Sequence, residues 1–258
     1  MRVLHLGQHL RLADDLALSR LGKGPGRLLS YGAYHTADGP LLPAGVATAV
    51  GDVLPLNVGG ISEDVAHAWF LEAGDHPWDA VTMPSAAKEQ AYSWAKAPRL
   101  DGLPAETGAT ARLAVAEHPL IAALIARDGG TSVRTRIVAR LVETALLVHS
   151  MRGWLRQLRL KDEFCSHFLL PEDASGAGLV EAARGALGHW VSIRGDRIDR
   201  YQIIAPTTWN FSPRDAAGVP GPLEAALAGL DTGGLGARSA ALQHVIRSFD
   251  PCMVCTAH

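Results

Sequence analysis

A long helical repeat in the middle of the chain constrains its fold more than any other feature. The repeat covers residues 131–158, and Thr131 or Ser132 suits the N-cap position because its side-chain oxygen can accept a hydrogen bond from a free backbone N–H. Apolar side chains recur on one predicted face, namely Val133, Ile137, Leu141, Ala145, Val148 and Met151. A helix of this length spans about 40 Å. We therefore expect a central element against which other helices pack.

Shorter helices and a few strands account for the rest of the pattern. Helices are predicted over residues 11–20, 63–72, 105–117, 119–127, 222–228 and 239–247. Strands are predicted over residues 27–34 and 46–58, together with a hairpin over residues 190–204 that turns at Gly195-Asp196. These segments predict a mainly α fold of the α+β class, a long-helix bundle with a small β portion.

The composition argues against several functional classes. The 258 residues are 48% hydrophobic and 19% charged, which suits a soluble globular protein with a sizeable core. A net charge of -2 offers no basic surface for nucleic acid, and no apolar run is long enough to predict a membrane span. The start of the chain carries no export signal, and three cysteines make no disulfide framework. We therefore expect a cytoplasmic protein.

The end of the chain carries the clearest chemical signal. Cys252 and Cys255 are two of only three cysteines, and two thiolates at this spacing can bind one soft or borderline metal ion. A redox disulfide or a merely reactive tail fits the same spacing. A closed tetrahedral site needs four ligands, and the sequence contains no second C-x-x-C pair. A metal site built here must therefore borrow ligands from elsewhere.

Five motifs follow one another in a fixed order along the chain. They are Y-S-W-A-K-A-P-R with E-T-G, A-R-G-A-L-G-H-W, Y-Q-I-I-A-P-T-T-W-N, S-P-R-D and D-P-C-x-x-C-x-x-H, within residues 92–108, 183–190, 201–210, 212–215 and 250–258. In this order they resemble the large subunit of nickel-iron hydrogenases. The resemblance runs from about residue 28 to residue 258 but covers only the C-terminal half of a complete large subunit. It implies that residues 1–258 form a single partial domain of that fold.

The resemblance implies a nickel-iron centre whose iron carries carbon monoxide and cyanide. Cys252 matches a terminal nickel ligand, and Cys255 matches a ligand that bridges the two metals. Arg184 is expected over the open metal position, where it pairs with Asp250. Splitting H2 heterolytically needs a base for the proton, and Arg184 and the Cys252 thiolate are the candidates.

Other matched residues imply the surroundings of this centre. Ala205, Pro206 and Thr207 would line the diatomic ligands, with Thr207 as a hydrogen-bond donor. His258 and the Ile203 carbonyl would help to bind a hydrated Mg2+.

The family's second C-x-x-C pair lies in an N-terminal half that this sequence lacks. The resemblance therefore implies that the chain either meets a separate N-terminal chain or is a fragment with no complete site, and that it is inactive without that half. It also implies an iron-sulfur small subunit as a partner, with H2 as the small-molecule ligand. One alternative hypothesis is a remnant that keeps the fold without binding nickel and is inactive. Another is a zinc or disulfide protein of the C-x-x-C type.

Smaller features resemble the hydrogen-sensing regulatory hydrogenases. Arg247 stands where many uptake enzymes have His, and Ala183 stands where many have Pro. Residues 29–34 and 61–64 show the same likeness. These features imply a role in hydrogen sensing, with a sensor kinase as a further partner.

Structural roles are the alternative for several polar residues. Cys165 matches no motif and suits a small core or surface position. Without the resemblance, Arg184 would be read as a surface ion-pair partner and Thr207 as a cap residue. Packing or interface ion pairs are expected for Lys96, Arg99 and Glu106.

Overall fold

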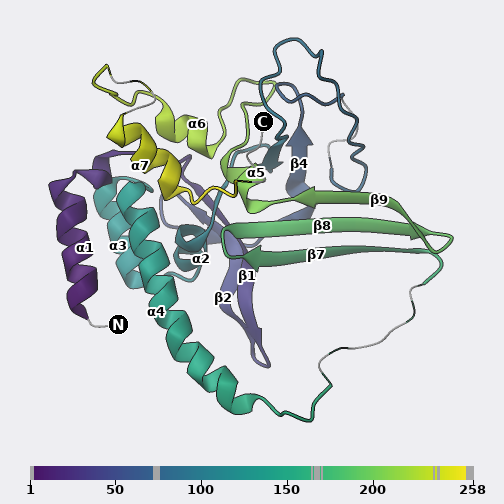
Figure 1. The fold of residues 1–258 in the computed structure, drawn as a ribbon, viewed down its shortest axis with the longest axis horizontal. Coiled ribbons are helices and arrows are strands. Elements are labelled where there is room, and N and C mark those ends of the chain that lie inside the picture. The colour runs from purple at the N-terminus through teal and green to yellow at the C-terminus, as the bar shows by residue number, and fades with distance from the viewer. Residues whose placement is uncertain are drawn as a thin grey trace.

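Helices gather on one side of the molecule and β-sheets on the other (Figure 1). The computed structural model describes residues 3–71, 76–163, 165, 169, 171–234, 236 and 239–253. Helices make up 33% of the structure and strands 27%. The expected α+β class is confirmed.

The long central helix is present as α4 (Val133–Gln157). Ser132 is its N-cap, with its hydroxyl accepting from the Thr135 N–H while Thr135 Oγ1 accepts from the Ser132 N–H at 2.6 Å. This capping box satisfies two backbone donors that a helix start otherwise leaves unpaired. The 25 residues of α4 span about 37 Å at 1.5 Å per residue.

The predicted apolar face of α4 is confirmed only in the first half of the helix, where Val133 is buried and Ile137 packs against the core. Val148 and Met151 are half exposed, and burial is confined to the first half of the helix. The buried residues there include Arg134, Arg136 and Glu143, which are charged. Periodicity of apolar residues misses such a face because each of these charges is buried together with an oppositely charged partner. The second half of α4 extends beyond the other helices (Figure 1).

The structure also contains several shorter helices. They are α1 (Val3–Asp15), the 3-10 helix η1 (Leu18–Arg20), α2 (Ala109–Val115), α3 (Pro119–Asp128), α5 (Pro206–Asn210), α6 (Pro222–Leu227) and α7 (Ala240–Ser248). Of these, α1, η1, α2, α3 and α7 contact α4. The predictions for α3, α6 and α7 are confirmed to within about two residues. The helix predicted over residues 11–20 begins earlier and breaks at Ala17, which adopts a left-handed backbone with φ 51°. Among the described helices, none alone is long and apolar enough to span a membrane, whereas α2 and α3 together pass that test but meet at 109°.

The helix predicted over residues 63–72 is wrong. Residues 61–64 form strand β4 (Ile61–Asp64), which pairs antiparallel with β5 (Ala97–Leu100), and residues 72–75 lie outside the described part of the chain. Buried Glu63 accepts a hydrogen bond from Gln202 and pairs with Lys96 at 3.5 Å. Long-range pairing therefore overrides the local helical preference.

The first sheet has the strand order β3-β2-β1-β6. Strand β1 (Arg27–Thr36) pairs antiparallel with β2 (Gly39–Thr48), which pairs with the short β3 (Val53–Leu54). The strand predicted over residues 46–58 is therefore wrong in its bounds, because the chain turns between β2 and β3. Strand β6 (Glu106–Thr107) runs parallel to β1, which explains why α2 starts at Ala109 rather than at the predicted residue 105.

The last sheet contains the predicted hairpin and one strand that was not predicted. Strands β8 (Gly185–Arg194) and β9 (Arg197–Ile204) pair antiparallel around the Gly195-Asp196 turn, as expected. Strand β7 (Ala174–Ala182) pairs residue by residue with β8. Its sequence, A-S-G-A-G-L-V-E-A, is rich in residues that rarely favour strands. The strand conformation of β7 therefore depends on its pairing with β8.

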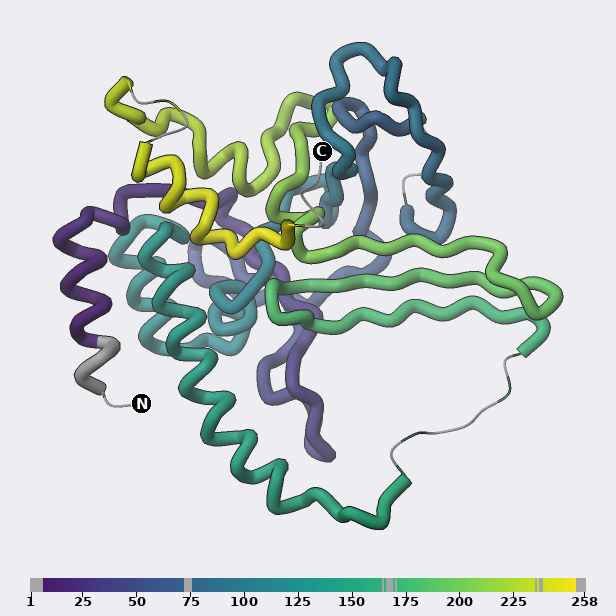
Figure 2. The backbone as a smooth tube through the Cα atoms, in the orientation of Figure 1, coloured from purple at the N-terminus to yellow at the C-terminus, as the bar shows by residue number. Residues whose placement is uncertain are grey.

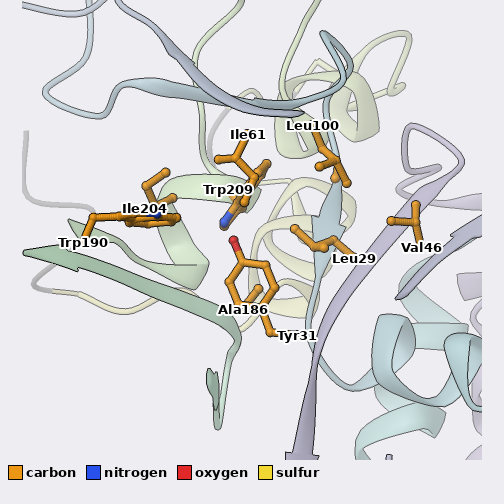
Figure 3. Close-up of a cluster of buried hydrophobic side chains, with 10 residues drawn as sticks. Leu29, Tyr31, Val46, Ile61, Leu100, Ala186, Trp190, Ile204 and Trp209 are labelled. Carbon is orange, nitrogen blue, oxygen red and sulfur yellow. The ribbon is translucent and has the colours of Figure 1, made fainter. Parts of the chain in front are cut away.

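A buried apolar cluster joins the three sheets to α5 (Figure 3). It consists of Leu29, Tyr31, Val46, Ile61, Leu100, Ala105, Ala186, Trp190, Ile204 and Trp209. The Tyr31 hydroxyl points toward Trp209, and burial raises the Tyr31 pKa well above its ordinary value. Because Ala186 and Ile204 belong to this cluster, it fixes the ends of β8 and β9 where the candidate site lies.

Candidate functional site

Arg184 sits in a tight turn that packs closely against β6. Ala182 pairs with Gly185, so Ala183 and Arg184 form the turn between β7 and β8. Gly185 has φ 135°, and a Cβ there would lie 2.4 Å from the Thr107 hydroxyl and 2.8 Å from the Gly108 nitrogen. Only glycine combines that backbone with so close an approach.

Arg112 of α2 holds the backbone of this turn through hydrogen bonds. Its guanidinium donates to the backbone carbonyls of Ala182 and Ala183 at 3.2 and 3.3 Å. It also donates to both carboxylate oxygens of Glu143 at 2.5 and 2.7 Å and to Glu181 at 2.7 Å. All three charged side chains are buried. The backbone just before Arg184 is therefore tied to both α2 and α4.

The electrostatics of this cluster favour a charged Arg112. Burial alone would lower the Arg112 pKa, but the hydrogen bonds and charges of Glu143 and Glu181 outweigh burial and raise it. Burial raises the Glu181 pKa, and the Arg112 charge opposes that shift. One arginine thus neutralises two buried carboxylates only in part, which makes the cluster sensitive to the loss of its cation.

Thr207 lies where β9 runs into α5. Ala205 is extended, Pro206 occupies the first helical turn, and Thr207 is 2% exposed. Asn210 fixes this short helix against β6, because its side chain donates to the Thr107 carbonyl and accepts from the Thr107 N–H, each at 3.0 Å. The start of α5 is therefore held next to the Arg184 turn.

The segment after α7 runs back to α5 (Figure 2). The Cys252 N–H donates to the Thr207 hydroxyl at 3.2 Å. Asp250, with a left-handed φ of 54°, brings its carboxylate to 3.9 Å from the Arg184 guanidinium. Both of these charged side chains are nearly half exposed, so their attraction adds at most about 1 kcal/mol to stability. The structure thus brings together Arg184, Thr207, Asp250 and Cys252, as the sequence predicted.

The other predicted metal ligands are Cys255, His258 and the Ile203 carbonyl. Cys255 and His258 lie outside the described residues. Ile203 pairs with His189 in the β8–β9 ladder, and its side chain is 45% exposed. Within the described ranges, no three His, Cys, Asp or Glu side chains lie close enough to hold a metal ion. The described donor set is thus one partly exposed thiol beside an arginine-carboxylate pair, which suits a thiolate ligand but not a complete metal site.

Two arginines near the site escaped the sequence interpretation. Arg136 and Arg140 of α4 line a small cavity of about 20 Å³ together with Arg184, Asp250, Glu106 and Thr107. Arg136 pairs with Glu106, which confirms the expected ion-pair role of that carboxylate. Arg99 likewise pairs with Asp215 at 2.8 Å. The sequence does contain a signal for them, because a helix expected to be central carries arginines at positions 134, 136 and 140.

Known large-chain proteins resemble this chain over most of its length. The pattern of the nickel-dependent hydrogenase family matches residues 14–258. The chain is 34% identical to the hydrogenase-1 large chain of Citrobacter freundii, over 90% of its own length and 47% of that protein. It is 32% identical to the uptake hydrogenase large subunit of Azotobacter chroococcum, over 97% of its own length and 53% of that protein.

Solved structures show the same likeness. The NiFeSe hydrogenase of Desulfovibrio vulgaris Hildenborough superimposes with a TM-score of 0.88 at 29% identity, covering 98% of this chain and 57% of the matched chain. The NiFeSe hydrogenase of Desulfomicrobium baculatum gives 0.87 at 31% identity, covering 98% and 56%. This chain spans about half the length of the relatives that it matches. It belongs to the nickel-dependent hydrogenase family and corresponds to the C-terminal part of the large subunit.

Proposed function

We propose that this chain supplies two thiolate ligands, Cys252 and Cys255, to a nickel-iron centre that activates H2. The observation that supports this proposal is the hydrogen bond from the Cys252 N–H to the Thr207 hydroxyl. Cys252 follows two residues after Asp250, whose carboxylate faces Arg184. This arrangement supports a shared role for Cys252 and Arg184 at one site. Family membership supplies the expected metal.

The residues of the chain would divide the work around that centre. A nickel-iron centre carrying carbon monoxide and cyanide would supply a Lewis acid. The Cys252 thiolate would accept the proton from H2. The Arg184 guanidinium, which faces the Asp250 carboxylate, would stabilise the charges that form there. The backbone at Ala205, Pro206 and Thr207, of which the last two residues are buried, would face the diatomic ligands.

A magnesium ion would complete the proposed site. The His258 imidazole and the Ile203 carbonyl would supply nitrogen and oxygen ligands, which Mg2+ accepts in an octahedral, partly hydrated shell.

We further propose that the chain works with an N-terminal large-subunit half and an iron-sulfur small subunit. Relatives about twice as long support the first partner. The second half of α4 supports it as well, because its apolar residues Leu146, Val148, Met151 and Leu155 are 39% to 64% exposed in the described part of the chain. A complementary half would bring the missing C-x-x-C pair.

The test is metal analysis of the assembled complex. The chain is co-expressed with an N-terminal half that carries a C-x-x-C pair and with the small subunit. Nickel and iron are quantified, and infrared spectra are recorded for cyanide and carbonyl bands. We expect about one nickel per complex, loss of nickel in Cys252→Ser, and no loss in the matched control Cys165→Ser. A wild-type complex without nickel and without these bands would contradict the proposal.

Hydrogen sensing is the second candidate, and two residues favour it. Ala183 and Arg247 differ from the uptake pattern, and both are exposed close to the site, Ala183 beside Arg184 and Arg247 in the last turn of α7. A sensor would turn over H2 slowly and alter the activity of a sensor kinase when H2 binds. Measuring both activities on one complex separates the candidates. Fast turnover without any effect on a kinase would exclude sensing.

A further inference from the structure

We propose that Arg140, supported by Arg136, is a positioning residue that fixes the C-terminal segment presenting Asp250 and Cys252. The inference rests on the proposed function for its meaning, since that function gives Cys252 its role. The contacts that support it all lie within this chain.

The first observation is that Arg140 caps the end of α7. Its Nη1 donates to the Ser248 carbonyl at 2.7 Å. The last carbonyls of a helix lack backbone partners and carry the negative end of the helix dipole. A guanidinium at this place therefore gains both a hydrogen bond and a favourable dipole interaction. The next residues along the chain are Phe249 and Asp250.

The second observation is that Arg136 packs against the ring of Phe249, the first residue after α7. Its guanidinium carbon lies 3.7 Å from the centroid of the Phe249 ring, a short cation-π distance. Two hydrogen bonds of 2.7 and 2.9 Å to the Glu106 carboxylate and one of 2.8 Å to the Gly22 carbonyl hold this guanidinium in place. Phe249 is thus held on a rigid support.

The third observation is that Arg140, which is half-buried, differs from the buried arginines of α2 and α4. Arg112, Arg134 and Arg136 each form an ion pair with a buried carboxylate. Among the described residues, no carboxylate oxygen lies within 4.0 Å of the Arg140 guanidinium, whose hydrogen bond goes to the Ser248 carbonyl. Burial lowers the Arg140 pKa, and the charge of Asp250 opposes this shift. A half-buried cation without a close carboxylate loses part of its hydration, and the hydrogen bond to the Ser248 carbonyl compensates for that loss.

Together these contacts clamp the segment at two points. Arg140 and Arg136 fix Ser248 and Phe249 at one end, and Thr207 holds the Cys252 N–H at the other end. Only Asp250 and Pro251 lie between, and Asp250 turns the chain with its left-handed backbone.

The test measures the reactivity of the Cys252 thiol in the metal-free chain of 258 residues. Cys165→Ser and Cys255→Ser leave Cys252 as the single cysteine, and its alkylation rate is followed with iodoacetamide. In Arg140→Met we expect a rate increase of about tenfold, the effect of losing one charged hydrogen bond that closes the segment. Arg140→Lys should restore most of the protection, because lysine also donates to a helix-end carbonyl. Arg11→Met, at an exposed position of α1, is the matched control and should not change the rate.

The outcomes separate this inference from the proposed function. A wild-type alkylation rate in Arg140→Met would overturn the positioning role, whatever metal the complex holds. If Arg140→Met does not fold, Arg140→Gln is measured in its place, and a wild-type rate there has the same meaning. A faster rate that Arg140→Lys does not reverse would also overturn it, because general loosening rather than the capping bond would then be responsible. A faster, lysine-reversible rate in a protein whose complex binds no nickel would confirm the clamp and refute the nickel proposal.

Discussion

At the scale of single residues, buried charges distinguish this protein from one with an ordinary apolar core. Arg112 is 1% exposed and contacts two carboxylates and two backbone carbonyls from two separate segments, α4 and residues 181–183. Buried ion clusters of this kind add little net stability, yet removing one member leaves uncompensated charge. The cluster therefore acts chiefly on geometry, by fixing the turn that carries Arg184.

Replacing Arg112 with methionine should destabilise the chain by about 3–5 kcal/mol. The reason is that Glu143 and Glu181 would remain buried without their cation. Urea unfolding followed by circular dichroism measures the change. Arg11→Met, exposed on α1, is the control and should stay within about 0.5 kcal/mol of wild type. Equal effects of the two substitutions would show that the cluster is not responsible.

Gly185→Ala tests the close approach of the Arg184 turn to β6. The added methyl group would meet the Thr107 hydroxyl and the Gly108 nitrogen, in a backbone with φ 135°. Gly39 has a similar φ of 113° but open space around it, so Gly39→Ala reports the backbone strain alone. We expect Gly185→Ala to lose about 1–3 kcal/mol more than Gly39→Ala in urea unfolding. Equal losses would mean that the turn moves away from β6 at little cost.

At the scale of elements, ion pairs join segments that are far apart in the sequence. Arg99 of β5 donates to Asp215, which also accepts from the backbone N–H groups of Ala217 and Val219. Burial alone would raise the Asp215 pKa, but these hydrogen bonds outweigh burial and lower it. The loop after α5 is therefore attached to β5 through a carboxylate that must be ionised.

This attachment should weaken in acid. A carboxyl whose pKa is lower in the folded chain contributes stability above its unfolded pKa, about 4, and loses it as pH falls through the folded pKa. The difference in free energy of unfolding between wild type and Asp215→Asn should thus be larger at pH 6 than at pH 2. Asp38→Asn, at the exposed β1–β2 turn, should show almost no difference at either pH. A gap between wild type and Asp215→Asn that is constant with pH would contradict the assignment.

Elements with local signals were predictable, and elements defined by distant partners were not. The start of α4 follows from Ser132 and the period after it, and the β8–β9 hairpin follows from its Gly195-Asp196 turn. Strand β7 depends on pairing with β8, and the buried face of α4 depends on carboxylates elsewhere in the chain.

The same distinction holds for the site. Arg184, Thr207, Asp250 and Cys252 could be predicted because each belongs to a motif with neighbouring residues. Arg140 could not, because the group that it binds is a backbone carbonyl 108 positions away, which no side-chain pattern reveals.

At the scale of the whole molecule, α4 connects a packed body to an uncovered surface. Its first half lies in the core with α2, α3 and α7, whereas its second half extends past them (Figure 1). Leu155 and Leu158 at the end of this helix are 64% and 70% exposed. Together with Val148 and Met151 they form an exposed apolar stripe, and such a surface is typical of an interface. The proposed N-terminal half is the partner that would cover it.

Charges on this stripe should therefore prevent assembly without unfolding the chain. In the double variant Met151→Glu with Leu155→Glu, both side chains are already more than half exposed, so the melting temperature of the isolated chain should change by no more than a few degrees. Burial of the two carboxylates against an apolar partner would cost several kcal/mol, enough to lower affinity for the N-terminal half more than a hundredfold. Size-exclusion chromatography and titration calorimetry of the mixed halves measure this affinity. Val50→Glu, at an 83% exposed apolar position in the β2–β3 turn, is the control for a general effect of added charge. Unchanged affinity in the double variant would place the interface elsewhere, whereas equal loss in Val50→Glu would point to nonspecific apolar association.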